Sequence, residues 1–495
     1  MTSSTRPDDV ALESRSGLAP WSEAELPKPP VPKGLAWIGT VGPGVIVLGA
    51  SIGSGEFLLG PAAFVKYGLT LLWVTGVAAF LQTVFNTELM RYTLATGEPV
   101  FTGFMRTKPR VGVWAWLYSI LYFLQIGWPG WAGAAAGAVF FLFAGRLAGP
   151  QDESTVYLIG VATFLVCVAI LLVGKRIERT LEILNWILVA FILTGFLILA
   201  LLLVGPATWA SAAAGFFAFD IDTGSFNLIP KGADFFLIGA FAAYSGAGGM
   251  INVTLSNWAR DKGYGMSSRT GYIPAAVGGS RVSLAHTGFK FVPNAESMER
   301  WRGWWRIVRV DQWGIYFIGA VLGMALPALL YVTFVPAGTD LRGLGVAAAL
   351  AQELRAQVGP FLGVFVALLG GWVLFKTQLD TLEGMTRAIT DILWTGNRRI
   401  REREGGDVRL VYYAVLAIVV VWGIVALRLT QPIVLLQLGA NMAGVVFIVT
   451  SIHLLYINTT FLPREIRPPL WRRVGLVATA VFYGVFVTLW IAHQV

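Results

Sequence analysis

One acidic residue lies in the middle of a long apolar stretch of the chain. Glu56 directly follows Gly53-Ser54-Gly55, about halfway through the apolar residues 38–66. An ionisable side chain at the centre of such a stretch costs at least a few kcal/mol if the stretch lies in a membrane, so it indicates a function. A carboxylate can bind a cation, and it can also cap the positive end of a helix that restarts after the glycines. The sequence leaves both roles open, and they are compatible.

A second group of residues with ligand chemistry follows another glycine cluster. Gly246-Ala247-Gly248-Gly249 interrupts the apolar residues 233–262 and is followed by Met250 and Asn252. Each glycine costs a helix about 1 kcal/mol relative to alanine, so three glycines within four residues predict a break. A break frees backbone carbonyls such as that of Ala247, and a thioether favours a transition metal over magnesium or calcium. Packing is the competing explanation for Met250, because methionine fills gaps in apolar cores.

The composition excludes an ordinary soluble enzyme. The chain has 495 residues, of which 56% are hydrophobic and only 13% charged, whereas soluble proteins carry about 25% charged residues. Its one cysteine and three scattered histidines exclude an internal disulfide, a zinc knuckle and an iron–sulfur cluster. An all-α membrane protein is predicted, with spans of about 20 residues or more. The eleven predicted spans are 38–66, 69–95, 112–146, 155–174, 180–205, 233–262, 308–337, 359–394, 409–427, 431–457 and 471–492.

The positive charges indicate how these spans are oriented. Lysine and arginine concentrate in alternate loops, among them 96–111, 260–307 and 458–473. Cytoplasmic loops carry such an excess, so we expect a cytoplasmic N-terminus and an external C-terminus in a bacterial inner (plasma) membrane. The net charge of +9 is then a topology signal that membrane lipids can neutralise, and nucleic acid is not an expected partner. The aromatic and basic residues of 301–309 are typical of a membrane interface.

The two glycine breaks divide the chain into related halves. They fall in the first and sixth spans, and five crossings invert the second set of spans relative to the first. Paired, glycine-interrupted spans in corresponding positions are a pointer to a transporter binding site, although close helix packing is the simpler use of glycine. The expected division is a flexible cytoplasmic tail (1–33), a first five-helix repeat (34–205), a second repeat (233–457) containing the cytoplasmic loop 260–307, and a last span at 471–492.

Short motifs resemble those of the Nramp divalent metal transporters. Ala247-Gly248-Gly249-Met250 is similar to their Ala-x-x-Met, and Gly42-Pro43-Gly44 to the Gly-Pro-Gly that opens their first helix. Leu435-Leu436-Gln437-Leu438 resembles their glutamine-bearing stretch. The resemblance implies an eleven-helix, leucine-transporter-type fold with broken helices 1 and 6. It also implies a transported divalent metal such as manganese or iron, without a permanently bound cofactor.

The chain departs from this family at its ligands. The family's Asp-Pro-Gly-Asn falls on Gly53-Ser54-Gly55-Glu56, and its Met-Pro-His-Asn falls on Met250-Ile251-Asn252-Val253. The predicted third span carries no acid where relatives place proton-route carboxylates. We therefore expect weak or absent proton coupling. The expected metal or substrate site is Glu56, Gly53, Ser54, Ala247, Met250, Asn252 and Gln437, and the expected helix breaks are Gly53, Gly55, Gly246, Gly248 and Gly249.

A second resemblance competes with the first. The stretch from Ile52 to Pro61 looks like the Ile-Gly-x-Gly-Ile-Phe…Pro of the amino acid–polyamine–organocation transporters. Glu56 replaces an apolar residue there and would repel a substrate carboxylate, so an amine or polyamine is the alternative substrate, ahead of an amino acid. No Ser-His-Asp ordering, zinc-protease motif or phosphate-binding loop is visible, so an enzyme is not expected.

The spacing of other charged residues within the spans predicts ion pairs. Glu88 and Arg91 are three residues apart, and Lys376/Asp380 and Glu383/Arg387 are each four apart on the eighth span. Lys376 has a further interpretation, because this span faces the first one where some relatives hold sodium. A lysine ammonium there would make transport independent of sodium. Lys376, Asp380 and Glu383 are accordingly the candidates for coupling or for an inner gate.

Overall fold

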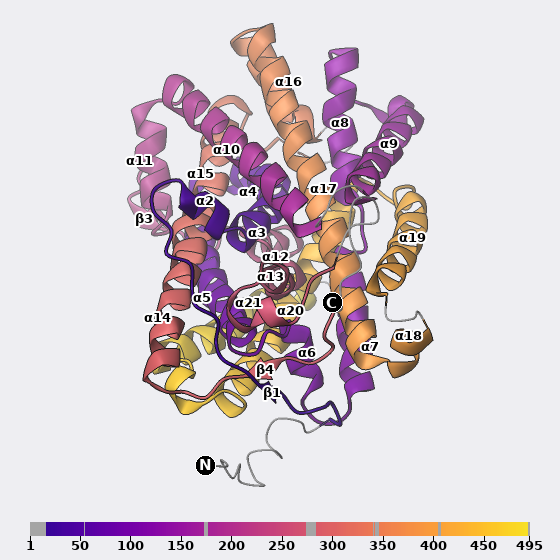
Figure 1. Cartoon of the computed structure of the whole chain (residues 1–495). Coiled ribbons are helices and arrows are strands. Elements are labelled where there is room, and N and C mark those ends of the chain that lie inside the picture. The colour runs from indigo at the N-terminus through magenta and orange to yellow at the C-terminus, as the bar shows by residue number, and fades with distance from the viewer. Residues whose placement is uncertain are drawn as a thin grey trace, which may run out of the picture.

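The computed structural model is a bundle of long helices (Figure 1). It describes residues 16–53, 55–172, 177–273, 284–339, 341, 346–403 and 407–493. The described residues contain ten helical segments that are long and apolar enough to cross a membrane. The helices of the predicted spans are α3 (Pro43–Ser51), α4 (Gly60–Tyr67), α5 (Leu72–Thr96), α7 (Val111–Ile126), α8 (Gly130–Ala144), α9 (Glu153–Leu172), α10 (Ile177–Leu203), α12 (Phe235–Ala243), α13 (Met250–Lys262), α15 (Ile318–Phe334), α17 (Pro360–Gly396), α19 (Val408–Ala426), α20 (Pro432–Thr460) and α21 (Leu470–Ala492). The seventh span begins earlier than predicted, because α14 (Ala295–Arg309), most of which lies in the expected loop 260–307, continues into it.

The predicted sixth span does not count among those ten because its helix is interrupted. It consists of α12 and α13, separated at residues 244–249, and neither half reaches the length of a span. The first span is also interrupted, since α3 ends at Ser51 and a π-helical turn, η1 (Gly55–Leu59), precedes α4. Both breaks fall where the glycines predicted them.

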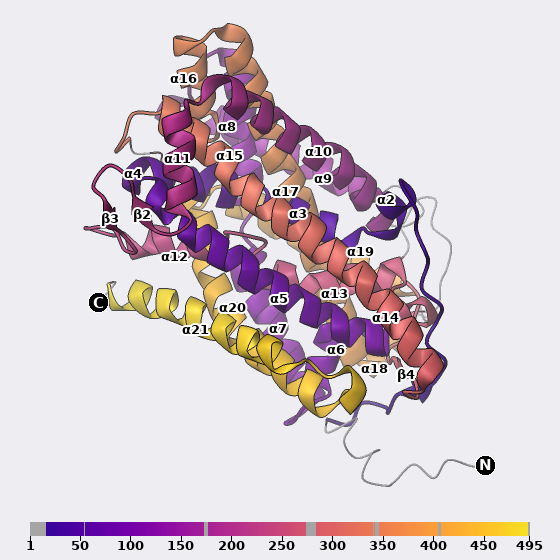
Figure 2. The same ribbon diagram turned by 90° about the vertical axis from the view of Figure 1, so that its left-hand side faces the viewer.

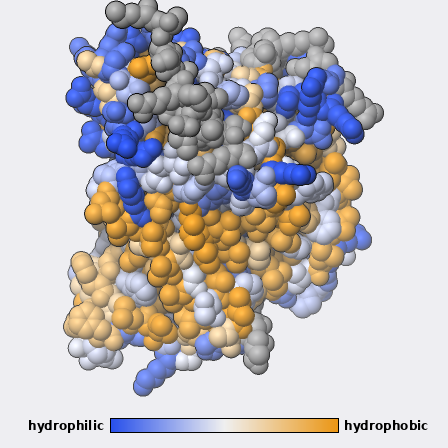
Figure 3. Space-filling view, turned by 90° about the horizontal axis from the view of Figure 1, so that it is seen from below, coloured by the Kyte–Doolittle hydropathy of each residue, from blue (hydrophilic) through white to orange (hydrophobic). Residues whose placement is uncertain are grey.

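The burial of each helix separates the centre of the bundle from its lipid-facing rim. The most apolar stretch of the first span is entirely buried, against 28% of that stretch in α9 and 22% in α21. Helices α10, α13 and α17 each pack against α3, and α3, α12 and α13 lie in the centre of the view in Figure 1. Viewed from below, the molecule exposes a broad hydrophobic area beside a region rich in hydrophilic residues (Figure 3). Glu56 therefore lies at the core of the bundle.

A third break was not predicted. The expected single span 112–146 is divided into α7 and α8 at Gly127-Trp128-Pro129. Proline lacks the N–H that would continue the helical ladder, and the carbonyl of Gly127 instead accepts a hydrogen bond from the Trp422 indole at 2.7 Å. The Gly-x-Pro sequence was the available signal, and it lies where the third span passes the centre of the bundle.

Short elements complete the chain between the spans. After α5 come α6 (Val100–Met105) and, before α9, the turn η3 (Pro150–Asp152). The connection between the fifth and sixth spans holds α11 (Pro206–Gly215) and a small hairpin of β2 (Phe219–Asp220) and β3 (Ser225–Phe226). The remaining short helical elements are α2 (Ala36–Thr40), η2 (Leu69–Leu71), η4 (Gly265–Arg269), η5 (Val310–Phe317), η6 (Val346–Ala348), α16 (Ala349–Gln357), α18 (Arg398–Arg403) and η7 (Arg464–Ile466).

The N-terminal segment departs from the expectation of a flexible tail. Of the predicted tail 1–33, residues 1–15 lie outside the described part, but residues 16–33 are docked on the bundle. Strand β1 (Ser22–Glu23) pairs in parallel with β4 (Phe289–Lys290). The indole of Trp304 donates to the carbonyl of Pro27 at 2.8 Å, and Leu26 is buried. Apolar residues between the charges of this segment, which composition alone does not reveal as anchors, explain the docking. We call residues 16–33 the strap.

The ion pair of Arg106 and Glu98 contacts the strap. The Arg106 guanidinium contacts Glu98, donates to the carbonyl of Ala19 at 2.9 Å and lies 5.0 Å from the ring centre of Trp21. Burial opposes the ionisation of Glu98, but Arg106 outweighs that effect and holds the pKa of Glu98 below its usual range. Glu98 also accepts from the backbone N–H of Gly288 at 2.7 Å. The pair therefore ties the strap to the loops that follow α5 and precede α14.

We expect Trp304→Phe to loosen the strap. The change removes the indole donor to Pro27 but keeps an aromatic ring, so it costs the net contribution of one hydrogen bond, about 0.5–1.5 kcal/mol. Amide hydrogen exchange over residues 16–33 should accelerate up to roughly tenfold. The matched control is Trp422→Phe, which removes an indole bond to a different carbonyl. Equal exchange in the two variants would contradict the docking.

Candidate functional site

The breaks in the first and sixth spans touch each other. A Cβ added to Gly55 would lie 1.7 Å from the carbonyl oxygen of Tyr244, so only glycine allows this approach. Tyr244 is the residue that follows α12. On the other side of the first break, a Cβ on Gly53 would lie 2.0 Å from Oγ1 of Thr377 in α17. The glycines of the first break therefore bring two spans against it. Ser54, the remaining predicted residue of this break, lies outside the described residues.

The second break needs glycine for its backbone conformation. Gly246, Gly248 and Gly249 have φ values of 138°, 77° and 55°, a region that residues with a Cβ rarely adopt. These are the three glycines from which the sequence predicted a break.

We expect Gly55→Ala to disrupt the contact between the two breaks. The added methyl group meets backbone on a neighbouring span, which cannot move aside as a flexible side chain would, so overpacking of about 1–3 kcal/mol or more is expected. The measurement is the thermal unfolding of the purified protein together with its uptake activity. Gly112→Ala is the control, because a Cβ there meets nothing within 4 Å, and it should leave both quantities unchanged or slightly raise stability.

Glu56 is bound by the groups of its own break. Its carboxylate accepts from the Ser51 hydroxyl at 2.7 Å and from the backbone N–H of Gly53 at 3.3 Å. The side chain is fully buried, and Gly323 of α15 packs close to it. The capping role proposed for Glu56 is thus visible in the structure. A cation would have to compete with these two donors for the carboxylate.

Three side chains that the sequence analysis missed hold the second break open. The amide of Gln125 donates to the carbonyl of Gly248 at 2.7 Å and accepts from the N–H of Met250 at 2.9 Å. The hydroxyl of Tyr316 accepts from the N–H of Ala247 at 3.1 Å and donates to Gln82 at 2.8 Å. Glutamines in apolar spans were the signal, since buried amides need hydrogen-bond partners.

The carbonyl of Ala247 stays available for a ligand. Within the described residues it accepts no backbone hydrogen bond outside the regular helices, whereas the N–H of the same residue is occupied by Tyr316. Tyr316 also lies within electrostatic range of Glu56, so it links the two breaks. The Met250 side chain is fully buried at the start of α13.

Asn252 is paired with an amide on another span. Its Nδ2 donates to Oδ1 of Asn86 in α5 at 2.9 Å. Oδ1 of Asn252 and Nδ2 of Asn86 are buried and make no hydrogen bond of regular geometry in the described residues, and both amides lie beside the Tyr316 hydroxyl. This pair of amides lies below the second break, at the position where the resembled family has histidine.

Lys376 lies against the end of α3. Its ammonium donates to the carbonyl of Gly49, lies 3.8 Å from Asp380 and is within electrostatic range of Glu56. The next residue, Thr377, donates to the carbonyl of Ile52 at 3.1 Å. The predicted pair of Lys376 and Asp380 is present, and Asn185 also donates to Asp380, at 2.9 Å. A positive charge carried by the protein thus faces carbonyls that the first break exposes.

A buried charge network joins α13 to α17 below the breaks. Arg387 pairs with Glu383 in the same helix, as predicted, and also with Asp261 of α13. Glu383 accepts from the Trp258 indole at 2.8 Å, and Arg260 pairs with Asp391 at 2.5 Å. The link between the sixth and eighth spans was not predictable from helical spacing, because its partners are far apart in the chain. We call these residues the inner network.

Gln437 does not join the two breaks. It lines a cavity of about 230 Å³ with Ala62, Leu237 and Thr339, at the opposite end of the bundle from the strap. Among the described residues it makes no side-chain hydrogen bond to Glu56 or to the second break, and its carbonyl accepts from Asn441 at 2.9 Å. The structure therefore places Gln437 at a cavity that none of the residues of the two breaks lines.

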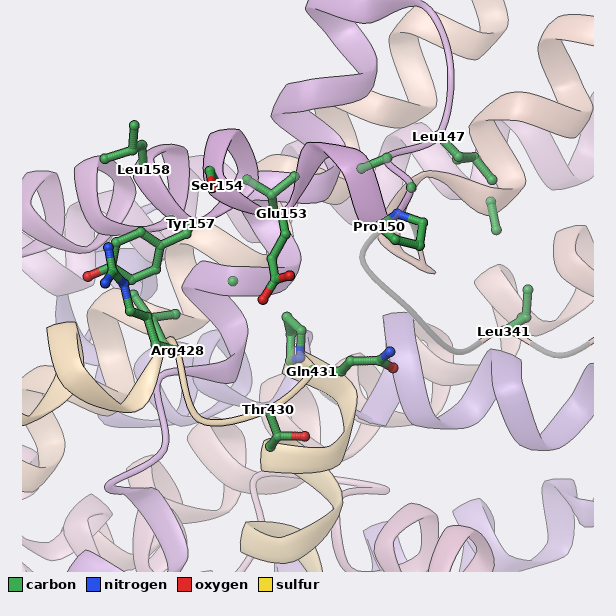
Figure 4. Close-up of a pocket in the computed structure, with 18 of the residues that line it drawn as sticks. Leu147, Pro150, Glu153, Ser154, Tyr157, Leu158, Leu341, Arg428, Thr430 and Gln431 are labelled. Atoms are coloured by element: carbon green, nitrogen blue, oxygen red, sulfur yellow. The ribbon is translucent and has the colours of Figure 1, made fainter.

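A larger cavity lies away from both breaks. It has a volume of about 1110 Å³ and is lined by the loop that follows α8, the start of α9 and the residues that join α19 to α20. Glu153 and Gln431 line it, and Arg428 lies beside Tyr157 (Figure 4). None of the residues expected to bind a substrate lines it, so the candidate site remains the contact between the breaks. No group of three His, Cys, Asp or Glu side chains able to hold a metal occurs in the described residues, so a cation at the breaks would rely on Glu56 and neutral ligands.

Comparisons with known proteins find partial relatives by sequence. A stretch of 174 residues is 29% identical to the divalent metal cation transporter MntH of Granulibacter bethesdensis, covering 35% of this chain and 36% of the relative. A stretch of 159 residues is 28% identical to MntH of Yersinia enterocolitica, covering 32% and 36%. The matches therefore span about a third of the length of these curated relatives. No family model matches the chain.

Solved structures extend the likeness to the whole fold. A variant of the manganese transporter of Eremococcus coleocola superposes with a TM-score of 0.64 at 16% identity, covering 97% of this chain and 91% of that one. A nucleobase-cation-symport-1 family transporter gives a TM-score of 0.51 at 14% identity over 98% and 96%. These likenesses confirm the predicted leucine-transporter-type inverted repeat. By sequence the chain resembles the MntH divalent metal cation transporters over about a third of its length, and by fold it resembles solved membrane transporters over nearly all of it.

Proposed function

We propose that the protein is a secondary transporter that carries a cation, most of all a divalent metal ion, across the membrane by alternating access. The observation that carries this proposal is the contact between two broken spans beside one buried carboxylate. Broken helices at membrane depth persist where they line a substrate path. The MntH relatives favour a metal such as manganese or iron over an amine, polyamine or amino acid.

The proposed ligands come from both breaks. Glu56 supplies the negative charge after leaving Ser51 and Gly53, while the Ala247 carbonyl and the Met250 thioether supply neutral contacts. The side-chain oxygen of Asn252 accepts a water of the hydrated ion below them. Gln437 meets the cation on its approach. Gly53 and Ser54 remain predicted contributors from the first break, and the N–H of Gly53 is the backbone group that Glu56 has to leave.

Alternating access would use the two five-helix repeats, residues 34–205 and 233–457. In the predicted orientation the strap and the inner network face the cytoplasm of a bacterial cell, and Gln437 faces outside. The network would close the inner side in the present state and would have to separate when the cation leaves. Lys376 and Asp380 would occupy the position between the first and eighth spans that a coupling ion could otherwise take.

Proton coupling would be weak or absent in this scheme. The spans α7 and α8 contain no acid, and Asn252 cannot exchange a proton. His453 also faces the third span, and both its ring nitrogens are engaged, with Tyr118 at 2.6 Å and Thr107 at 2.9 Å. A histidine held in this way supports packing of α20 against α7 and does not form a relay with a carboxylate.

The test is uptake into proteoliposomes that contain a metal-sensitive dye and a pH-sensitive dye. Manganese should enter at equal rates in sodium and choline buffers, because Lys376 stands in for a coupling cation, and the lumen should not acidify when the membrane potential is clamped. Uptake of a radiolabelled polyamine without uptake of manganese would show that the substrate is a polyamine and not a metal. Manganese-dependent acidification would overturn the proposed coupling.

We expect Met250→Ala to change metal selection. A thioether gains little from calcium but binds softer ions such as cadmium favourably. Competition of cadmium and calcium against manganese uptake should show a loss of cadmium affinity that exceeds the loss of calcium affinity. Equal losses would reduce Met250 to a packing residue.

A further inference from the structure

One tryptophan is held between two arginines where three helices meet. The guanidinium carbon of Arg91 in α5 lies 4.2 Å from the ring centre of Trp305 in α14, and that of Arg472 in α21 lies 4.9 Å from it. Both arginines also bind Glu88, at 2.7 and 3.1 Å. Glu88 therefore neutralises the charges closest to Trp305, and the cation–π contacts fix how α14 and α21 lie against α5.

Further arginines surround this contact without such neutralisation. Arg302, Arg306 and Arg309 recur every three or four residues on α14, so they share one face of the helix. All three are exposed, and none forms an ion pair with a carboxylate in the described part of the chain. Arg309 lies within electrostatic range of Arg472. These three arginines thus lie along α14 on both sides of the Trp305 contact.

A second group of arginines approaches from the turn before α21. Arg464 and Arg473 both lie within electrostatic range of Arg467. Burial and these two like charges outweigh the neighbouring Glu465 carboxylate and hold the pKa of Arg467 below its usual range. Arg91 donates to the carbonyl of Ile466 at 2.7 Å, which ties this turn to α5. We call Arg302, Arg306, Arg309, Arg464, Arg467 and Arg473 the basic cluster. Like charges brought together by the fold favour an anion between them.

The neighbouring apolar residues indicate which kind of anion. Leu470 and Trp471, at the start of α21, are 75% and 51% exposed, and Trp471 lies beneath the Arg472 guanidinium, 4.4 Å from its ring centre. Helix α21 is one of the rim helices, and it and α14 reach the same end of the bundle (Figure 2). Exposed apolar side chains beside exposed arginines at the end of a membrane span are typical of a lipid headgroup site.

We infer that the basic cluster binds the phosphate group of an anionic phospholipid, whose acyl chains lie along Leu470, Trp471 and the outer face of α21. The arginines supply paired N–H donors to the phosphate, which guanidinium groups bind with two bonds at once. The bound lipid bridges α14 and α21, so it holds the start of the seventh span against the last span. This site does not depend on which ion the protein carries.

Native mass spectrometry of the full chain, delipidated and then titrated with phosphatidylglycerol or phosphatidylcholine, tests the inference. The unaltered protein should retain phosphatidylglycerol in preference to phosphatidylcholine. The variant Arg306→Gln/Arg309→Gln should bind phosphatidylglycerol about 30-fold more weakly, since each cation near an anionic lipid contributes a factor of about five. The control Arg398→Gln/Arg399→Gln removes two exposed charges from α18 at the same end of the bundle and should bind it as the unaltered protein does.

Three results would overturn the inference. Equal weakening in the two double variants would mean unspecific attraction to surface charge. Equal retention of the two lipids would mean that the phosphate is not recognised through its net charge. Full thermal stabilisation by inorganic phosphate alone, with no further effect of phosphatidylglycerol, would mean that the ligand is a free anion. Circular dichroism of each variant confirms that the exposed substitutions leave the fold intact.

Discussion

Glu56→Gln is expected to abolish cation uptake. Glutamine keeps the size and the hydrogen-bonding oxygen of the side chain, so Ser51 and Gly53 retain an acceptor. It removes the one negative charge at the contact between the breaks, and a desolvated cation without a counter-charge is strongly disfavoured. Loss of one partner of a buried ionic contact costs about 3–5 kcal/mol, which corresponds to a decrease of at least about 100-fold in affinity. Manganese uptake and calorimetric binding measure this decrease.

Two variants separate charge from structure in that experiment. Ser51→Ala removes the hydroxyl donor at 2.7 Å but leaves the carboxylate, so it should preserve uptake or strengthen cation binding. Glu56→Asp keeps the charge on a shorter side chain and should retain part of the activity. If Glu56→Gln transports as well as the unaltered protein while remaining folded, Glu56 only caps the break and the proposed site is wrong.

Arg387→Gln is expected to cause the largest loss of stability. The guanidinium is fully buried and binds Glu383 and Asp261. Its removal leaves the buried Glu383 carboxylate without its cation and takes from Asp261 one of its two arginines, the other being Arg260, so a destabilisation of about 3–5 kcal/mol is expected. The same change weakens the link between α13 and α17, so a cysteine introduced at the lower end of α13 should react faster with a reagent added from the strap side. Denaturant unfolding and the labelling rate are the two measurements.

A second substitution provides the control for Arg387. Asp261→Asn removes one of the two carboxylates, so combining it with Arg387→Gln should recover part of the lost stability. Such a positive coupling is expected only for residues in direct contact. Arg398→Gln, which removes an exposed pair with Glu402, should change stability little. Additive losses from the Arg387 and Asp261 changes would contradict the inner network.

The breaks were predictable because glycine destabilises a helix locally and allows backbone conformations that other residues rarely adopt. Gly246, Gly248 and Gly249 adopt positive φ values that few other residues tolerate, so their sequence carries the information. The third break also has a local cause, because Pro129 lacks the N–H that would continue the helix. It was missed because the span around it is long and uniformly apolar. Local signals of this kind need no knowledge of the tertiary structure.

Contacts between distant segments were not predictable in the same way. Helical spacing identified the pair of Glu383 and Arg387, but Asp261 joins them from another span, and no periodicity relates the two segments. Gln437 was placed with the breaks through a resemblance of four residues, whereas the structure puts it beside a separate cavity. The strap was expected to be flexible because its composition is polar, and the buried Trp21 and Leu26 show that two apolar anchors alter that outcome.

Anomalous X-ray scattering from crystals soaked in manganese tests the central claim most directly. The account predicts one anomalous peak at the contact between the breaks, within coordination distance of the Glu56 carboxylate and the Ala247 carbonyl, with Glu56 turned away from Ser51. Crystals of Glu56→Gln should lack this peak. A manganese peak elsewhere in the bundle, with Glu56 still bound to Ser51 and Gly53, would contradict the account.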